Sequence, residues 1–422
     1  MVQREAKKIL NHLIQAGGQV YYTGGCVRDQ LLDKPVKDLD VVVFRLEAET
    51  LRGVLAEFGE VLYYGKSFPI YQLRGLPIEF SLPRGDPHNS RRAPVVTGGI
   101  KALLEADARH RDYTVNALYR NALTGELSDP LGGLTDMENG RLSIVAPTAL
   151  QEDPLRVCRG IQLASRLGLE PDAMTLQAMR DASLESVATE RVILEWHKWL
   201  MAEDPVRGWN LMIRTRHLPA IFSQEDTVDP LVTTVVPAVL QAAAQRRGEV
   251  NDPLSFMWAV LLASLALVGP DKRTSVVAWF ENISRHLALT KRIDGLLQCA
   301  AEFAEKTRRR SDVARLTLMT DSQDLVMTME VLTPLWEHVQ WQEQIVQSLR
   351  RFRNWMPKEP VKRLVRGRDL KTLGYPSDHR MAAWLEIAFQ LQLEGVSRDI
   401  ILKYFRHHAD VLHGIQRDET GR

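Results

Sequence analysis

The sequence predicts an α+β protein in which one mixed β-sheet forms an N-terminal head and helices form nearly all of the rest. Short β-rich runs alternate with turns up to about residue 148, whereas beyond residue 150 apolar residues recur at helical spacing. A chain of 422 residues is also too long for one ordinary domain. We therefore expect a head over residues 1–147, a helical neck over 148–220, a helical body over 221–345 and a helical tail over 346–422.

The expected elements follow from runs of β-forming or helix-forming residues and from the turns between them. Glycine and proline separate the runs, as at Gly24-Gly25 and Lys34-Pro35. The strand-like runs are QVYYTGG, LDVVVF, EVLYY, IYQLR and IEFSLP, and the helical patterns of the head cover Val27–Leu32 and Ala48–Phe58. After the head, apolar residues at i, i+3, i+4 and i+7 predict helices over Glu152–Leu167 and Glu190–Met201.

The composition is that of an ordinary globular protein rather than a polycation. Hydrophobic residues make up 45% and charged residues 25% of the chain, and the formal net charge is +1, so a nucleic-acid surface needs local segregation of charge. The scattered Cys26, Cys158 and Cys299 lack the paired spacing of a thiolate metal site and fit a reducing compartment. The sequence shows neither the apolar core of a secretory signal nor a membrane-spanning stretch, so we expect a cytoplasmic protein.

The junction between the first expected strand and helix has the properties of a phosphate-binding turn. The strand Val20–Tyr22 runs into Gly24-Gly25, and a helix begins near Cys26. Glycines allow a close backbone approach, and the N–H groups exposed at such a junction suit a phosphate. Arg28, one turn into the helix, could add a fork of donors to a triphosphate. Because such turns also occur without a ligand, the prediction depends on the carboxylates that follow.

Asp38 and Asp40 form an acidic pair at the start of an apolar strand. Positions i and i+2 of a strand face the same side, so both carboxylates project from one face. Oxygen ligands of this kind suit Mg²⁺, which can activate an attacking 3′-oxygen and stabilise a leaving pyrophosphate. Glu79, in another strand-like run, is a candidate third catalytic carboxylate. The alternatives are a solvated turn for the pair and an exposed strand position for Glu79.

The Gly-Gly turn and the acidic pair lie in a stretch that resembles the first motif of the class II tRNA nucleotidyltransferase and bacterial poly(A) polymerase family, GGCVRDQLLDKPVKDLDVVV. Four further stretches resemble the later motifs in order: HRDYTVNAL, DPLGGLTDM, EDPLRVCRGIQLASRLG and ERVILEWHKWL. A weaker resemblance to the tail of bacterial CCA-adding enzymes follows at VKRLVRGRDLKTLGYPSDHRMAAWLEIAFQLQLEG. The resemblance implies a nucleotidyltransferase-type head, Mg²⁺ at Asp38 and Asp40, and template-independent addition of C and A from CTP and ATP to the 3′ end of tRNA.

The resemblance also implies a set of nucleotide-binding residues. They are Gly24, Gly25, Arg28 and Asp29 in the first motif, Arg111 and Asp112 in the second, and Asp153, Arg156 and Arg159 in the fourth. Arg111 and Asp112 would contact the phosphate and ribose, with a surface ion pair before a helix as the alternative. The third motif, and Trp196 and Trp199 of the fifth, are expected to be structural.

Asp153 and Arg156 are expected to read the base. They lie at i and i+3, so on a helix they share a face. A carboxylate accepts hydrogen bonds and a guanidinium donates them, which matches the exocyclic amine and ring nitrogen that cytosine and adenine present side by side. Uracil and guanine carry a carbonyl at the amine position and would leave buried groups unpaired. The pattern therefore favours CTP and ATP, and it is also compatible with a capped helix start.

Some positions depart from the usual pattern of the family. His110 stands where the second motif usually has an arginine, and in the fourth motif Gln162 replaces an arginine and Gly160 an alanine. One positive group near the nucleotide is lost, which leaves the end product open. The polar segment Arg84–Ile100 occupies the place of a flexible loop that helps the C-to-A switch, and its ordinary length argues against an enzyme limited to CC addition.

A basic segment near the C-terminus is the candidate RNA-binding surface. Between Arg350 and Lys371 there are nine Lys or Arg residues against two acids, a distribution that suits an RNA backbone. The predicted RNA-binding residues are Arg350, Arg351, Arg353, Lys362, Arg363, Arg366 and Arg368. A solvated basic helix face is the alternative, and the resemblance of the tail favours RNA.

Three other functions are compatible with the sequence. A partial enzyme that adds only CC or only A, and a poly(A) polymerase of the same family, would carry the same motifs. A non-catalytic RNA-binding protein on the same fold would need no metal, and the intact Asp38 and Asp40 argue against it. The expected partners are tRNA, CTP and ATP, with no membrane and no obligate protein partner.

Overall fold

The computed structural model describes residues 2–64, 70–83, 99–218, 230–268, 320–333, 342–356 and 362–419, with isolated positions between 296 and 317. The chain divides into two compact units, Met1–Ala220 and Ile221–Arg422. The first unit holds the β-rich region and the helices that follow it, and the described part of the second is helical. The finer division into head, neck, body and tail remains a prediction.

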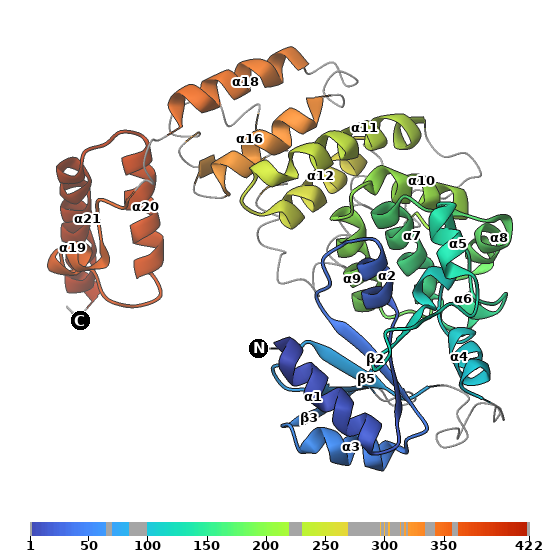
Figure 1. Cartoon of the computed structure of the whole chain (residues 1–422). Coiled ribbons are helices and arrows are strands. Elements are labelled where there is room, and N and C mark those ends of the chain that lie inside the picture. The colour runs from blue at the N-terminus through green and yellow to red at the C-terminus, as the bar shows by residue number, and fades with distance from the viewer. Residues whose placement is uncertain are drawn as a thin grey trace. The chain divides into compact units, whose positions relative to one another are not determined.

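One seven-stranded sheet forms the head, in the order β3-β4-β5-β2-β1-β6-β7 (Figure 1). Its strands are β1 Gln19–Thr23, β2 Leu39–Phe44, β3 Val61–Tyr64, β4 Ile70–Leu73, β5 Ile78–Ser81, β6 Tyr119–Asn121 and β7 Leu127–Ser128. β2 and β5 run parallel and the other neighbours run antiparallel, which confirms the predicted mixed sheet. All five strand-like runs of the sequence contribute to it.

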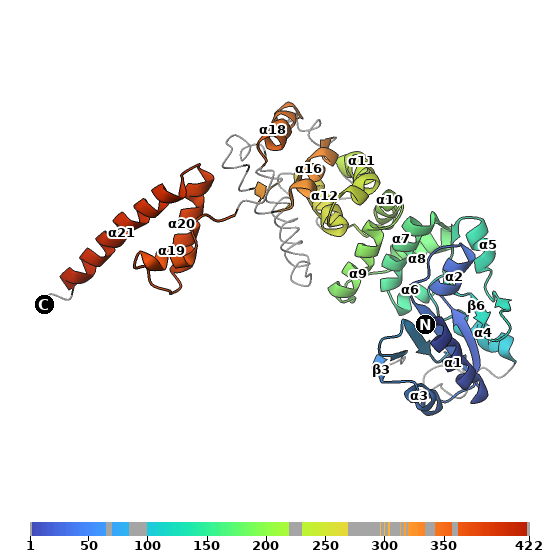
Figure 2. The ribbon, with the colours of Figure 1, turned by 60° about the vertical axis from the view of Figure 1, so that its left-hand side comes forward.

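The two faces of the sheet differ because side chains alternate along each strand. α1 (Val2–Gln15) and α3 (Ala48–Ala56) pack on one face, where they share a core with Val41 and Val43 of β2. Figures 1 and 2 show both helices beside the sheet. Full burial of such a valine stabilises the fold by about 1.5–3 kcal/mol. Asp40, directly before Val41, consequently projects from the opposite face.

Short elements and helices complete the first unit. In chain order they are α2 Gly25–Leu31, α4 Ile100–Ala108, η1 Thr114–Asn116, α5 Gly133–Glu138, β8 Arg141–Leu142, α6 Ala149–Glu152, α7 Leu155–Leu167, β9 Glu170–Pro171, α8 Ala173–Asp181, α9 Thr189–Leu200 and α10 Pro205–Thr215. α7 packs against α9 and α10. A Cβ at Gly208 of α10 would lie 2.3 Å from Ser165 Oγ and 2.4 Å from the Trp199 ring. The backbone of α10 therefore packs directly against side chains of α7 and α9. Trp196 and Trp199 are buried, which confirms their predicted structural role.

The helix that the sequence predicts over Glu152–Leu167 is broken in two. α6 ends at Glu152, α7 begins at Leu155, and Asp153 between them is extended with φ −144° and ψ 96°. A proline disfavours the helical conformation in the residue before it, so Pro154 explains the break. Asp153 therefore does not lie on the helix that carries Arg156, and the predicted shared helical face is wrong.

All regular elements in the described part of the second unit are helices. Its helices are α11 Pro230–Arg246, η3 Arg247–Glu249, α12 Pro253–Val268, α16 Ser322–Val331, α18 Gln342–Trp355, α19 Gly367–Thr372, α20 Met381–Leu393 and α21 Arg398–Glu419. α19, α20 and α21 share a small apolar core that includes Leu370, Phe389 and Phe405. Of the helices within the described ranges, none is both long and apolar enough to cross a membrane.

Candidate active site

A cavity of about 340 Å³ lies in the first unit, beside the face of the sheet that α1 and α3 leave open. Its volume lies within the range of small-molecule sites. The lining residues are Gly24, Gly25, Asp40, Ile70, Ser81, Leu82, Asp107, His110, Arg111, Asp112, Asn116, Asp153, Arg156 and Arg159. Residues of the first, second and fourth motifs, far apart in the sequence, therefore meet around one space. Four of the predicted catalytic and nucleotide-binding residues do not line it: Arg28, Asp29, Asp38 and Glu79.

The three predicted catalytic carboxylates lie near one another, with Asp40 and Glu79 on the cavity face of the sheet and Asp38 at a bend just before β2. Asp40 of β2 pairs in register with Glu79 of the parallel strand β5, and Asp38 precedes Asp40 by two residues. Burial, and then the charges of Asp40 and Asp38, raise the pKa of Glu79. Burial also raises the pKa of Asp40, against the lowering effect of Arg111 and Arg159. A bound cation would relieve this repulsion among the carboxylates.

These carboxylates suit a hard divalent cation. Mg²⁺ prefers oxygen ligands and is usually bound by one or two carboxylates together with phosphates of the substrate. Asp38 and Asp40 supply two such groups beside a cavity of nucleotide size. Within the described part of the chain, no three His, Cys, Asp or Glu side chains are grouped to hold a metal by themselves. A metal ion at Asp38 and Asp40 would take its other ligands from water and a triphosphate.

Gly24 brings the backbone close to the catalytic strand. Its φ of +71° is a conformation that residues with a side chain rarely adopt. A Cβ at this position would lie 3.2 Å from Asp40 Oδ2 and 3.4 Å from Arg111 Nη1. The turn therefore lies directly against the Asp40 carboxylate, and its predicted approach to a phosphate stays a prediction.

Arg111 is a cation fixed beside Asp40. Its guanidinium donates to Asp107 Oδ2 at 3.2 and 3.3 Å and to the Tyr119 hydroxyl at 3.0 Å. Burial acts to lower the pKa of Arg111, but its neighbours Tyr119 and Asp107 raise it above the usual value, so the group stays charged. Sequence reasoning missed Asp107, near the end of α4, although it lies four residues before Arg111, a spacing that often marks an ion pair.

Asp153 and Arg156 both line the cavity, but each has its own partners. Arg156 donates to the carbonyl oxygens of His110 at 2.7 Å and of Ala149 at 2.9 Å. Asp153 accepts a hydrogen bond at 3.3 Å from Arg191. The sequence predicted Arg191 at the start of a helix but did not predict this contact. The two predicted base-reading groups are therefore held in the wall separately, one by backbone carbonyls and the other by the fifth motif.

Asp112 is a buried acid that binds the α7 helix. It forms an ion pair with Arg159 at 2.9 Å and accepts hydrogen bonds from the Tyr113 N–H at 2.8 Å and Asn116 Nδ2 at 3.1 Å. Burial acts to raise the pKa of Asp112, but Arg159 and these hydrogen bonds lower it below its ordinary value. A surface ion pair, the alternative for this motif, is excluded because Asp112 is buried.

We expect the first unit to lose stability as the pH falls below about 4, the ordinary pKa of an aspartate. Asp112 binds its proton more weakly in the folded protein than in the unfolded chain. The contribution of ionised Asp112 to the free energy of unfolding is therefore fully present above the pKa that it has in the unfolded chain. This contribution is lost as the pH falls through its pKa in the folded protein. Urea unfolding of the wild type and of Asp112→Asn between pH 7 and pH 3 measures this contribution. A stability difference that stays constant over this range would contradict it.

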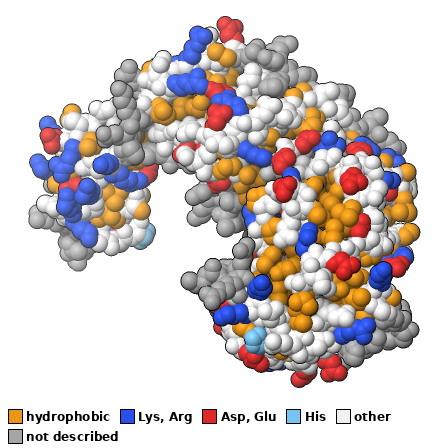
Figure 3. All heavy atoms as spheres, viewed as in Figure 1, with side chains coloured by type: hydrophobic (Ala, Val, Ile, Leu, Met, Phe, Trp, Pro, Cys, Tyr) orange, Lys and Arg blue, Asp and Glu red, His pale blue; other side chains and the backbone are white. Residues whose placement is uncertain are grey.

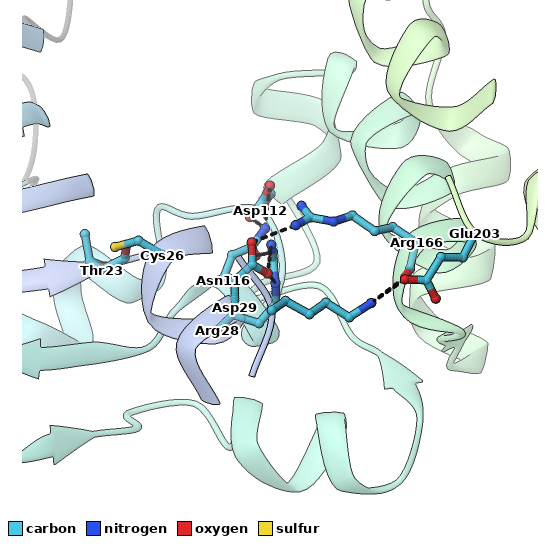
Figure 4. Close-up of polar contacts among 9 residues, drawn as sticks. Thr23, Cys26, Arg28, Asp29, Asp112, Asn116, Arg166 and Glu203 are labelled. Atoms are coloured by element: carbon cyan, nitrogen blue, oxygen red, sulfur yellow. Dashed lines mark hydrogen bonds and ion pairs between the residues drawn. The ribbon is translucent and has the colours of Figure 1, made fainter. Parts of the chain in front are cut away.

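Arg28 and Asp29, which the resemblance placed at the nucleotide, lie in a buried network (Figure 4). Arg28 donates to Asp29 Oδ1 at 2.7 and 2.9 Å and to Asn116 Oδ1. Arg166 of α7 donates to Asp29 Oδ2 at 2.7 Å. These bonds join α2, η1 and α7, and the structure does not bring either predicted residue into the cavity wall. Sequence reasoning passed over Asn116 and Arg166, although both lie inside the motif stretches.

The predicted RNA-binding residues lie in the second unit. Exposed side chains among them are Arg350, Arg353, Lys362, Arg363, Arg366 and Arg368, while Arg351 is half-buried. Arg353 pairs with Glu330, and Arg363 pairs with Glu386 at 2.8 Å. The positive charges of these two arginines are therefore partly neutralised by acids of the same chain. Phe352 is buried against Phe303 and is a core residue. Residues 84–98, most of the expected loop for the C-to-A switch, lie outside the described residues.

Two family models and several curated relatives match the chain. The Poly A polymerase head domain covers residues 20–143, and the probable RNA and SrmB-binding site of polymerase A covers residues 168–226. A CCA-adding enzyme of Lactiplantibacillus plantarum is 35% identical over 227 residues, which are 52% of this chain and 55% of that protein. A CCA-adding enzyme of Streptococcus pyogenes serotype M3 is 30% identical over 296 residues, which are 65% of this chain and 67% of that protein. The chain belongs to the CCA-adding enzyme family.

Solved structures of CCA-adding enzymes share the fold. The Bacillus stearothermophilus CCA-adding enzyme in complex with CTP aligns with a TM-score of 0.64 at 19% identity, covering 98% of this chain and 99% of that one. The Thermotoga maritima CCA-adding enzyme complexed with tRNA aligns with a TM-score of 0.58 at 18% identity, covering 94% and 93%. This likeness confirms the predicted nucleotidyltransferase-type head followed by helices. CCA-adding enzymes are tRNA nucleotidyltransferases and generally depend on a metal ion.

Proposed function

We propose that this chain adds C and A nucleotides from CTP and ATP to the 3′ end of tRNA, with Mg²⁺ and without a nucleic-acid template. One observation carries the proposal: a single cavity is lined both by Asp40 and by the pair Asp153 and Arg156. Asp40 is a carboxylate placed to bind a metal, whereas the pair offers a base one acceptor and a set of donors. A nucleoside triphosphate has both chemical parts, and the cavity has the size to hold one.

The residues near the phosphate end suit the transfer step. Asp38 and Asp40 would hold Mg²⁺, which favours ionisation of the attacking 3′-hydroxyl and offsets the charge of the triphosphate. Arg111, kept charged by Tyr119 and Asp107, lines the cavity next to Asp40 and suits a phosphate oxygen. The absence of a side chain at Gly24 leaves the approach to Asp40 open. The 3′-oxygen would attack the α-phosphorus, and pyrophosphate would leave.

The residues near the base end suit a choice by hydrogen bonding. Arg191 orients the Asp153 carboxylate, and two backbone carbonyls orient Arg156. Side chains held by such hydrogen bonds cannot easily move to a new position. A base with a carbonyl in place of the amine would therefore leave the Asp153 carboxylate without a hydrogen-bond donor. Arg159, half exposed and paired with Asp112, lines the same cavity and adds a positive charge beside the nucleotide.

The second unit supplies the proposed tRNA surface. Figure 3 shows Lys and Arg side chains gathered over α19–α21. The exposed basic residues of this surface include Lys362, Arg363, Arg366, Arg368, Arg380 and Arg398. Phosphate contacts of this kind provide affinity that does not depend on sequence. We place the enzyme in the cytoplasm, and its three free thiols support a reducing compartment.

The deciding experiment offers the purified protein three tRNA transcripts: one lacking CCA, one ending in C and one ending in CC. Each is incubated with Mg²⁺ and CTP, ATP or both, and the products are resolved at single-nucleotide length. Addition that stops at CCA supports the proposal. Stopping at CC, or extending only the CC transcript, identifies a partial enzyme, and long A tails identify a poly(A) polymerase. No addition under any condition would favour a non-catalytic RNA-binding protein.

We expect CTP or ATP with Mg²⁺ to raise the melting temperature of the protein. A ligand at 100 times its Kd stabilises the folded state by about 2.7 kcal/mol. Replacing Mg²⁺ by EDTA should reduce the shift because the triphosphate then meets the carboxylates without a bridging cation. Differential scanning fluorimetry measures the shift, with Asp40→Asn as the variant whose shift should not depend on Mg²⁺. An equal Mg²⁺ effect in both proteins would place the metal elsewhere.

A further inference from the structure

A chain of polar side chains, buried except at the arginines that end it, connects the head to two points on α7. It runs from Arg159 through Asp112, Asn116, Arg28 and Asp29 to Arg166, and Figure 4 shows the part from Asp112 to Arg166. The chain begins and ends on the same helix, while the four residues between belong to the head. It therefore closes a loop with α7.

Every link in this loop joins a donor to an acceptor. The ion pairs at its two ends are 2.9 Å for Arg159 with Asp112 and 2.7 Å for Arg166 with Asp29. The four inner residues are each at most 7% exposed. Buried polar groups are costly when one partner is removed, so a network with all its links satisfied defines one arrangement of the elements that it joins.

The ion pairs Arg159–Asp112 and Arg166–Asp29, here called the clamp, hold α7 against the head at two points. Arg159 and Arg166 are separated by seven residues, or two helical turns, so they project from the same face of α7 and lie about 10.5 Å apart along its axis. One ion pair would still allow the helix to pivot about it. Two pairs on one face, each with a carboxylate of the head, remove this pivot and fix the angle between the axis of α7 and the head.

The clamp connects the two ends of the nucleotide cavity. Arg156 and Arg159 of α7 line the base end, and Gly25, at the start of α2, lines the phosphate end. Asp29 is on α2 and Arg166 is the last charged residue of α7, and neither lines the cavity. A change at either residue would therefore reach the base-reading side chains only by letting α7 move relative to α2.

We infer that Asp29 and Arg166 are a positioning pair that sets nucleotide selectivity by holding α7 against α2. The inference rests on the proposed function and assigns to this pair a task different from the direct nucleotide contact expected for Asp29. Loss of the pair relaxes the angle of α7, so Arg156 and Asp153 no longer present a fixed pattern to the base. Discrimination against UTP and GTP then falls more than catalysis with CTP falls.

The test compares Arg166→Gln and Arg166→Lys with the wild type. The ratio of kcat/KM for CTP over UTP, on the transcript lacking CCA, is expected to fall about tenfold in Arg166→Gln. It should stay near the wild-type value in Arg166→Lys, since an ammonium retains the charge opposite Asp29. The matched control is Glu203→Gln, which removes an exposed ion pair of Lys34 close to Arg166 and should leave the ratio unchanged.

Two outcomes would overturn the inference. One is an unchanged CTP-to-UTP ratio in Arg166→Gln, and the other is an equal loss of activity with all four nucleotides, which a merely structural role would produce. The Tm of each variant shows whether it is folded. If the wild type itself adds no nucleotide, the proposed function fails. Selectivity is then measured as the difference in Tm shift between CTP and UTP, which still decides the role of the pair.

Discussion

Asp40→Asn is expected to lower nucleotide addition at least about 10³-fold while the protein stays folded. A metal ion contributes several kcal/mol to the stabilisation of the transition state, and each 1.36 kcal/mol corresponds to a factor of ten in rate. Asparagine has the shape of aspartate but offers a weaker neutral ligand. Because burial raises the pKa of Asp40, removal of its charge should not destabilise the fold. Single-nucleotide addition assays and urea unfolding measure the two effects separately.

Two further variants make this result specific. Asp33→Asn changes an exposed acid at a φ of +52°, a conformation that asparagine also tolerates, and it should retain full activity. Glu79→Gln tests the third carboxylate, and an activity equal to the wild type would mean that Glu79 is only a strand residue. Substantial activity in Asp40→Asn would exclude the assignment of the metal to β2.

Gly160→Ala is expected to destabilise the protein by about 1–3 kcal/mol, the usual cost of overpacking a core. The Cβ of an alanine there would lie 2.0 Å from the Tyr113 hydroxyl oxygen and 2.6 Å from the ring carbon that carries it. That hydroxyl donates to the Arg156 carbonyl oxygen at 2.7 Å, so it cannot move away without losing a buried hydrogen bond. Urea unfolding curves measure the change in the free energy of unfolding.

Tyr113→Phe supplies the second half of this experiment. Alone, it should cost about 1 kcal/mol because it removes one buried hydrogen bond. In its background Gly160→Ala should be less harmful than in the wild type, since the closest atom is gone. A double-mutant cycle gives this coupling directly. Additive effects of the two substitutions would show that Tyr113 is not the reason for a glycine at position 160.

Much of the head could be predicted from the sequence because its signals are local. Alternation predicted Asp38 and Asp40 on one face at the start of an apolar strand. The structure confirms the strand from Leu39 and places Asp40 on the face opposite Val41 and Val43, whereas Asp38 lies just before the strand. The Gly-Gly turn likewise predicted a close backbone approach suited to a phosphate. In the structure the turn lies against Asp40, where a Cβ at Gly24 would be 3.2 Å from Oδ2, and the phosphate remains a prediction. The ordered motifs correctly indicated the family.

The remaining features depend on pairings between distant segments, which a local pattern does not contain. Arg28 has the position of a phosphate ligand in the sequence, yet its bonds to Asp29 and Asn116 appear only once η1 lies against α2. The apolar periodicity also predicted one helix through Asp153. In the structure the helix is interrupted there, because Pro154 disfavours the helical conformation of the residue before it. The sequence showed a glycine at position 160 where the family usually has an alanine. Only the fold shows that the Tyr113 side chain occupies the space that the alanine Cβ would need.

The register of β2 against β5 determines more than the stability of the sheet. Asp40 stands opposite Glu79, although 38 residues separate them along the chain. A slip of one residue would turn Glu79 toward α1 and α3 and remove it from the carboxylate cluster. Changes of length in the connecting segment that preserve the pairing would leave the acids where they are. The pairing of β2 with β5, rather than the length of the turns between them, therefore keeps these acids together, while α3, β3 and β4 in the connection belong to the core and the sheet.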